Sequence, residues 1–130
     1  MKLGDNIQTA DWKKEKHAPV IEAPETVKAG EPFMVKLSIG KEIAHPNTTA
    51  HHIAWMELYF KPEGDKFIYQ VGHFEFPAHG ASVQGADTGP VWTNPVAKCS
   101  VTVNGPGTLV ATSYCNIHGL WENSQELKIG

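Results

Sequence analysis

Short stretches of the chain alternate between hydrophobic and polar residues, which is the pattern of β-strands that lay one face on a core. Phe33 to Ile39 is the clearest, because its odd-numbered residues are all apolar. His51 to Phe60 is apolar on both faces, which is typical of a strand in the middle of a sheet. The turn-forming residues Pro62 to Asp65 then lead into Phe67 to Phe76, so the two segments predict a hairpin.

The same pattern predicts further strands on either side of this hairpin. We expect them at Val20 to Ala23, at Ala97 to Val103, at Thr108 to Tyr114 after the turn Asn104 to Gly107, and around Gln125, Leu127 and Ile129. Asp5 to Lys13 suggests a short helix, and Pro77 to Pro95 a long Gly/Pro-rich loop of the kind that serves function or an interface. About seven short strands indicate an all-β fold, an immunoglobulin-like β-sandwich.

Length and charge narrow the class of protein. A chain of 130 residues suits one domain, so we expect residues 1–130 to form a single sandwich. The net charge of -3 offers no basic excess for nucleic acid. Neither a secretory leader nor a stretch near the roughly 18 apolar residues of a membrane span is visible, so we expect a cytoplasmic protein without membrane partners.

Seven histidines in so short a chain are unusual, and histidine is a common transition-metal ligand. The sharpest local motif is Tyr114 to Gly119, which contains Cys115 and His118 where a predicted strand ends. On a continuing strand these two side chains would point to opposite faces, so sharing a metal requires a turn, which Gly119 permits. Such a turn would also direct backbone N–H groups at the sulfur.

Two other segments offer imidazoles. His45 and His51 flank a turn-forming Pro-Asn pair between two predicted strands, and His17 follows directly after Glu15 and Lys16. Imidazoles and a thiolate suit iron, copper or zinc rather than magnesium or calcium. Because structural zinc takes four ligands, a set of four histidines and one cysteine favours a metal that accepts five or six.

The motifs E-K-H-A-P at 15–19, H-P-N-T-T-A-H-H-I at 45–53 and C-N-I-H-G at 115–119 together resemble the superoxide reductases, and in particular their one-iron neelaredoxin type. The resemblance covers essentially the whole chain. It implies an immunoglobulin-like sandwich holding one iron (Fe2+/Fe3+) through four equatorial imidazoles and an axial thiolate. These ligands fall on His17, His45, His51, His118 and Cys115. It further implies that Glu15 is the sixth ligand of the oxidised iron, and that Lys16 attracts superoxide and helps to supply protons.

The resemblance also implies an activity and partners. Members of the family are oxidoreductases that detoxify superoxide by reducing it to hydrogen peroxide, without releasing oxygen. They receive electrons from rubredoxin or a similar small carrier, and the family suggests a homotetramer. Two-iron members carry an additional rubredoxin-like centre that needs four more cysteines, so the two cysteines Cys99 and Cys115 indicate the one-iron class.

Other residues invite a plainer interpretation. We expect His52, His73 and His79 to be structural rather than ligands, and Cys99 to be a buried small hydrophobic residue. Trp121, just after His118, is a candidate for shielding the metal.

Three alternatives stay open. A disulfide between Cys99 and Cys115 would remove the thiolate. A cupredoxin-like electron carrier would need two histidines, one cysteine and a weak axial methionine, but no methionine follows Cys115. A sandwich module that binds partners without a metal would leave the histidine clusters unexplained.

Overall fold

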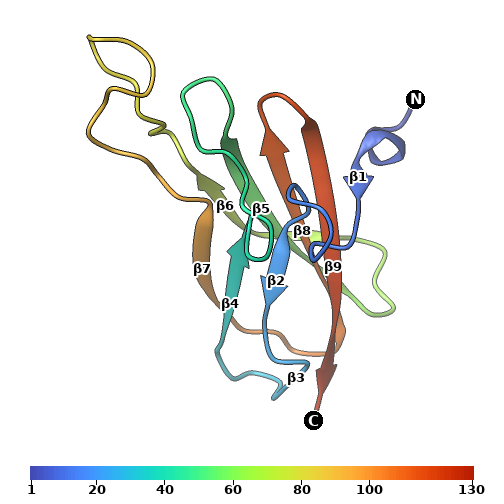
Figure 1. Cartoon of the computed structure of the whole chain (residues 1–130). Coiled ribbons are helices and arrows are strands. Elements are labelled where there is room, and N and C mark those ends of the chain that lie inside the picture. The colour runs from blue at the N-terminus through green and yellow to red at the C-terminus, as the bar shows by residue number, and fades with distance from the viewer.

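A computed structural model describes all 130 residues and consists of two facing β-sheets (Figure 1). The elements in chain order are η1 (Leu3–Asn6), β1 (Gln8–Thr9), β2 (Val20–Glu22), β3 (Thr26–Val27), β4 (Phe33–Ser38), β5 (Ile53–Pro62), β6 (Tyr69–Glu75), β7 (Val96–Val101), β8 (Gly107–Cys115) and β9 (Gly119–Ile129). The larger sheet has the order β1-β9-β8-β5-β6, with β3 also paired to β9, and the smaller has the order β2-β4-β7.

This topology is the predicted immunoglobulin-like sandwich. The chain passes between the sheets at every connection except those from β5 to β6 and from β8 to β9, so strands distant in sequence become neighbours. Strands β1 and β3, of two residues each, pair in parallel with β9 and were not predicted. No helix of the structure combines the length and apolar character needed to cross a bilayer.

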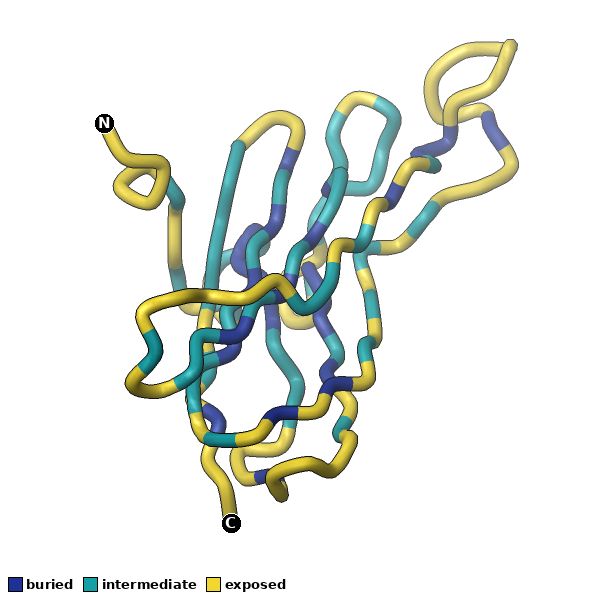
Figure 2. Tube along the Cα trace, turned by 180° about the vertical axis from the view of Figure 1, so that it is seen from behind, coloured by how far each residue is buried: buried dark blue, intermediate teal, exposed yellow.

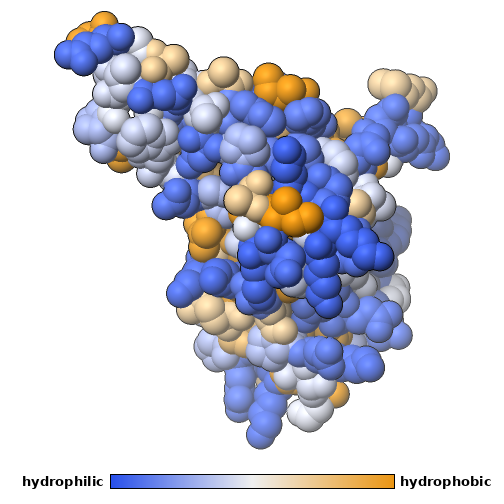
Figure 3. All heavy atoms as spheres, in the orientation of Figure 1, coloured by the Kyte–Doolittle hydropathy of each residue, from blue (hydrophilic) through white to orange (hydrophobic).

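The core lies between the sheets and is formed by alternate residues of the strands. Val35 and Leu37 of β4 face Met56, Leu58 and Phe60 of β5 from the opposite sheet, and all five are buried. Buried segments therefore run through the middle of the sandwich, whereas the chain ends and many loop residues are exposed (Figure 2). On the face seen in Figure 3, hydrophobic residues appear only in small groups among hydrophilic ones.

Two expectations from the sequence differ from the structure. The helix expected over Asp5 to Lys13 is wrong: a single 3-10 turn at Leu3–Asn6 is followed by β1. The edge of β9 supplies pairing partners for β1, with Gln8 opposite Trp121, and this tertiary pairing replaces helical hydrogen bonds. Strand β9 also begins at Gly119, well before the segment around Gln125 from which a final strand was predicted.

The long loop over Pro77 to Pro95 is confirmed, and it protrudes from one end of the sandwich (Figure 1). Hydrogen bonds within it hold His79 opposite Trp92 and Ser82 opposite Gly85. Val83 is fully exposed on this loop. The loop is therefore an ordered projection that offers apolar side chains to the surroundings.

The contacts of His73 in β6 support a structural role for this residue and lead to a pH prediction. Its Nδ1 lies 3.0 Å from a Glu57 carboxylate oxygen and its Nε2 3.1 Å from Glu75. Hydrogen bonds to Glu75 and then Glu57 raise the pKa of His73 above its usual 6.5. Because the folded pKa is raised, this contribution to stability is complete below the unfolded pKa and is lost as pH rises through the folded one.

We expect an NMR titration of the His73 ring to have its midpoint above 6.5, and Glu75→Gln to lower that midpoint. An imidazole signal that titrates at the usual pH in both proteins would contradict the assignment.

Candidate metal centre

Three connections carry the predicted ligands to the same end of the sandwich. His17 precedes β2, and the hydroxyl of the buried Ser113 of β8 donates a hydrogen bond to the His17 carbonyl oxygen at 3.2 Å. His45 and His51 lie in the connection between β4 and β5, and Cys115 is the last residue of β8. Since β5 and β8 are paired neighbours, the histidine loop and the cysteine emerge side by side.

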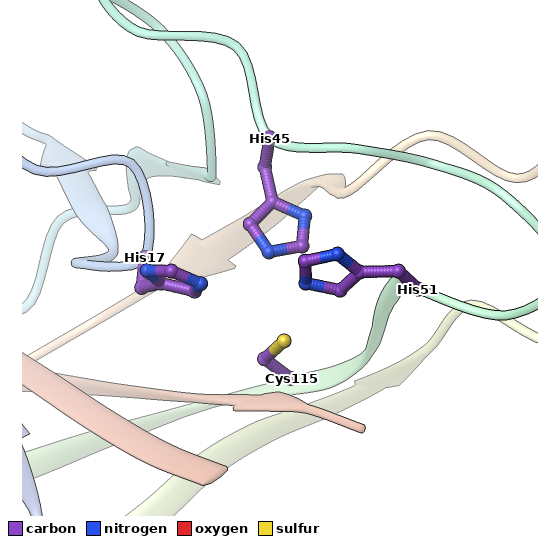
Figure 4. Close-up of side chains that lie close together, drawn as sticks. All are labelled: His17, His45, His51 and Cys115. Carbon is purple, nitrogen blue, oxygen red and sulfur yellow. The ribbon is translucent and has the colours of Figure 1, made fainter. Parts of the chain in front are cut away.

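The side chains of His17, His45, His51 and Cys115 point towards a common centre (Figure 4). One ligand atom from each residue lies within 4.8 Å of those of all the others. Cys115 is completely buried and His17 nearly so, while the other two rings are partly buried. The predicted meeting of these three distant segments is therefore present in the fold.

His118 approaches the same centre through its Nδ1 nitrogen. Its Nδ1 lies 3.0 Å from Nε2 of His17 and 3.7 Å from Sγ of Cys115. The expected turn is confirmed: Gly119 has a positive φ of 79°, and the backbone N–H of His118 donates to the Cys115 sulfur at 3.4 Å. The two ends of the C-N-I-H motif can thus act on one metal although they are three residues apart.

Hydrogen bonds on the outer sides of the rings direct their unprotonated nitrogens inward. Nδ1 of His17 donates to the Glu15 carboxylate at 2.7 Å, and Nδ1 of His45 donates to the Pro46 carbonyl oxygen at 2.7 Å. Each ring therefore turns Nε2 towards the centre as a lone pair. Nε2 of His45 and Nε2 of His51 are buried without any hydrogen-bond partner, an unfavourable state that a bound cation would relieve.

Burial also keeps two of the rings in the form that binds metals. Desolvation lowers the pKa of His45 to about 4, although its hydrogen bond to Pro46 acts in the other direction. The pKa of His51 is lowered as well, again mainly by burial and then by the neighbouring His118 and His17. The positive charge of Lys16 also lowers both pKa values.

Trp121 forms one wall of the site. Its ring stacks on His17 with 5.0 Å between ring centroids and an interplanar angle of 15°. Its indole N–H donates to the carbonyl oxygen of His118 at 3.2 Å. Trp121 therefore holds two of the candidate ligands in place, a packing role that fits its predicted position beside the metal.

The residues expected to lie outside the site do so. His52 and His79 stack on each other at 3.5 Å between centroids and hydrogen-bond to loop groups. Both cysteines are free, so the disulfide alternative is not formed. Cys99 is only partly buried rather than buried as expected, because β7 is an edge strand.

Two residues inside the motifs were given no role from the sequence. Thr48 closes the turn that carries His51, and Asn116 connects that turn to the cysteine. In the sequence, only their positions within the motifs H-P-N-T-T and C-N-I-H could have indicated a role for these two residues.

The chain is similar to known proteins over nearly its whole length. Residues 9–124 match the sequence profile of the desulfoferrodoxin family. A neelaredoxin of Megalodesulfovibrio gigas is 57% identical, with 99% of each chain covered. A superoxide reductase of Pyrococcus furiosus is 53% identical over 97% of this chain and 99% of that protein.

Solved structures agree with this relationship. The superoxide reductase (neelaredoxin) of Archaeoglobus fulgidus in its reduced form superimposes with a TM-score of 0.87 at 58% identity, covering 94% of this chain and 98% of that one. The fold, the converging imidazoles and thiolate, and the extended sequence identity therefore establish that the chain belongs to the desulfoferrodoxin family, close to its neelaredoxin-type members.

Proposed function

We propose that this protein is a superoxide reductase whose iron is held by His17, His45, His51, His118 and Cys115. The observation that carries the proposal is the convergence of inward-facing ring nitrogens around one buried sulfur. Relatives that are more than half identical to this chain bear the names neelaredoxin and superoxide reductase. Bound iron would supply the single electron that, with two protons, converts superoxide to hydrogen peroxide.

The charges of the site explain how an acidic protein attracts an anion. Iron(II), four neutral imidazoles and one thiolate sum to a single positive charge, and the ammonium of Lys16 balances the carboxylate of Glu15, which bonds to the His17 ring. This positive charge acts locally on an anion at the site, whereas the net charge of -3 is spread over the whole chain. Lys16 is half-exposed, so it can meet the incoming anion and pass on protons from water.

Glu15 is proposed as the sixth ligand in the oxidised state. In the structure its carboxylate also accepts the backbone N–H of His17, at 3.1 Å, in addition to the ring N–H. The same carboxylate therefore orients a ligand ring, and it would have to leave that ring to occupy the sixth position.

The donor set favours iron over the blue-copper alternative. A cupredoxin site needs only two histidines with one cysteine and a weak axial methionine. Three imidazoles meet Cys115 here without counting His118. Met34 is exposed on β4, the middle strand of the smaller sheet, and Met56 is buried in the hydrophobic core of the sandwich.

We further propose that rubredoxin or a similar small carrier re-reduces the iron, and that the protein is cytoplasmic and forms a homotetramer. Val83, Val91 and Trp92 are exposed on the protruding loop and would supply apolar contacts between subunits.

The experiment that tests the activity combines metal analysis with product analysis. Protein purified without oxygen should contain one iron per chain. When pulsed with superoxide, the reduced protein should yield hydrogen peroxide without oxygen. Release of oxygen would indicate dismutation instead, and a protein that takes up no iron would refute the proposal.

Lys16→Ala should slow the reaction with superoxide by roughly tenfold, because electrostatic focusing raises association rates by at least that factor. The metal ligands are untouched, so the visible absorption of the oxidised protein should not change. The matched control is Lys14→Ala, an exposed lysine two residues away. Equal rates for the two variants would remove Lys16 from this role.

A further inference from the structure

The side chain of Asn116 joins the two loops that carry His51 and Cys115. Asn116 follows Cys115 directly, and its Oδ1 accepts the backbone N–H of His52 at 2.9 Å. Its Nδ2 donates to the carbonyl oxygen of Ala50 at 2.9 Å, and its own backbone N–H donates to the carbonyl oxygen of His52 at 3.2 Å. These three hydrogen bonds fix the backbone on both sides of His51.

Two of these three bonds come from the Asn116 side chain, and neither strand pairing nor the local turn replaces them. The ladder between β5 and β8 becomes irregular between Ile53 and Trp55 and ends with Ile53 opposite Cys115. Thr48 closes the turn internally, since its hydroxyl accepts the His51 N–H at 3.0 Å and its N–H donates to the His51 carbonyl oxygen at 2.9 Å. That turn could still move as a unit relative to the sulfur.

We propose that Asn116 is a positioning residue that fixes the imidazole of His51 relative to the sulfur of Cys115, and thereby sets the affinity and thiolate bonding of the metal. The inference rests on the proposed function only in taking these two side chains as metal ligands. Ligand orientation by outer hydrogen bonds is worth about 10- to 100-fold in metal affinity. A small displacement of the His51 imidazole relative to the Cys115 thiolate, which lie on separate loops, would lower the metal affinity in the same way as a misoriented ligand.

Cobalt(II) tests the proposal without any superoxide chemistry, because its bond to a thiolate gives an intense charge-transfer absorption. In Asn116→Ala, we expect cobalt affinity, measured by competition with a chelator, to fall by about 10- to 100-fold, and the thiolate band to shift. In the metal-free variant the His52 amide should exchange its hydrogen faster, while the amide of Ser113 in β8 should not.

Asn104→Ala is the matched control, since Asn104 is exposed in the turn at the opposite end of β8. It should bind cobalt like the unaltered protein. Unchanged affinity and band in Asn116→Ala would overturn the proposal, as would equal losses in both variants, which would indicate general destabilisation. If the unaltered protein binds cobalt through its thiolate but does not reduce superoxide, the proposed function fails while Asn116 is still judged by these measurements.

Discussion

Replacing Cys115 by serine is expected to abolish the visible thiolate-to-iron absorption of the oxidised protein and to lower iron affinity by more than about 100-fold, since losing an outer hydrogen bond alone costs about 10- to 100-fold. The sulfur is completely buried among the imidazoles, so water cannot take its place without rearrangement. Reduction of superoxide should be lost with it. Absorption spectra, iron content and peroxide yield measure the three effects.

Cys99→Ser provides the matched control for Cys115→Ser. Cys99 lies on β7 of the smaller sheet, is only partly buried, and its sulfur contacts the carbonyl oxygen of Ser100 at 3.7 Å. Its replacement should leave the absorption and iron content unchanged. If Cys115→Ser retained the visible band, or if Cys99→Ser lost it, the sulfur assigned to the metal would be the wrong one.

Leu58→Ala is expected to lower the free energy of unfolding by about 2–5 kcal/mol, the usual cost of removing a buried leucine side chain. Leu58 is completely buried in β5, the strand that pairs with both β6 and β8. The neighbouring backbone is held by ladders on both sides, so it cannot collapse into the cavity. Denaturant unfolding of the metal-free protein measures the effect.

Leu3→Ala is the control for Leu58→Ala, because Leu3 is 65% exposed and should change stability by less than about 0.5 kcal/mol. A similar small effect for Leu58→Ala would mean that the two sheets do not pack as described. The ligands lie in loops at one end of the sandwich, so folded Leu58→Ala protein should keep the absorption of the metal site.

The strands were predictable where one face is buried and the other is exposed to solvent. Phe33 to Ile39 alternates, and the structure has β4 at Phe33–Ser38 with Val35 and Leu37 inside. The start of β9 was not predictable, because Gly119 to Asn123 are all partly buried and show no clean alternation. Strands β1 and β3 could not be predicted either, since two residues carry no period and exist only through pairing with β9.

The composition of the candidate site was predictable from its motifs, but its internal contacts were not. Spacing around Cys115 and His118 indicated a turn, and Gly119 forms it. The sequence could not reveal that Glu15 holds the His17 ring, or that Asn116 reaches back to the His51 loop. The Asn116 contact joins two distant segments, whereas Glu15 and His17 are only two residues apart, and the bond between their side chains depends on how the loop before β2 folds.

By itself the sequence determined what is local in this protein: the alternation that makes strands, the turns that end them, and the donor types placed just beyond those ends. The tertiary structure alone decided which ends meet, which ring nitrogen of each histidine faces the centre, and which side chains connect the loops. The physical reason is that alternation and turn formation act between near neighbours, whereas the shape of a metal site depends on how two sheets pack and on hydrogen bonds between loops far apart in the chain.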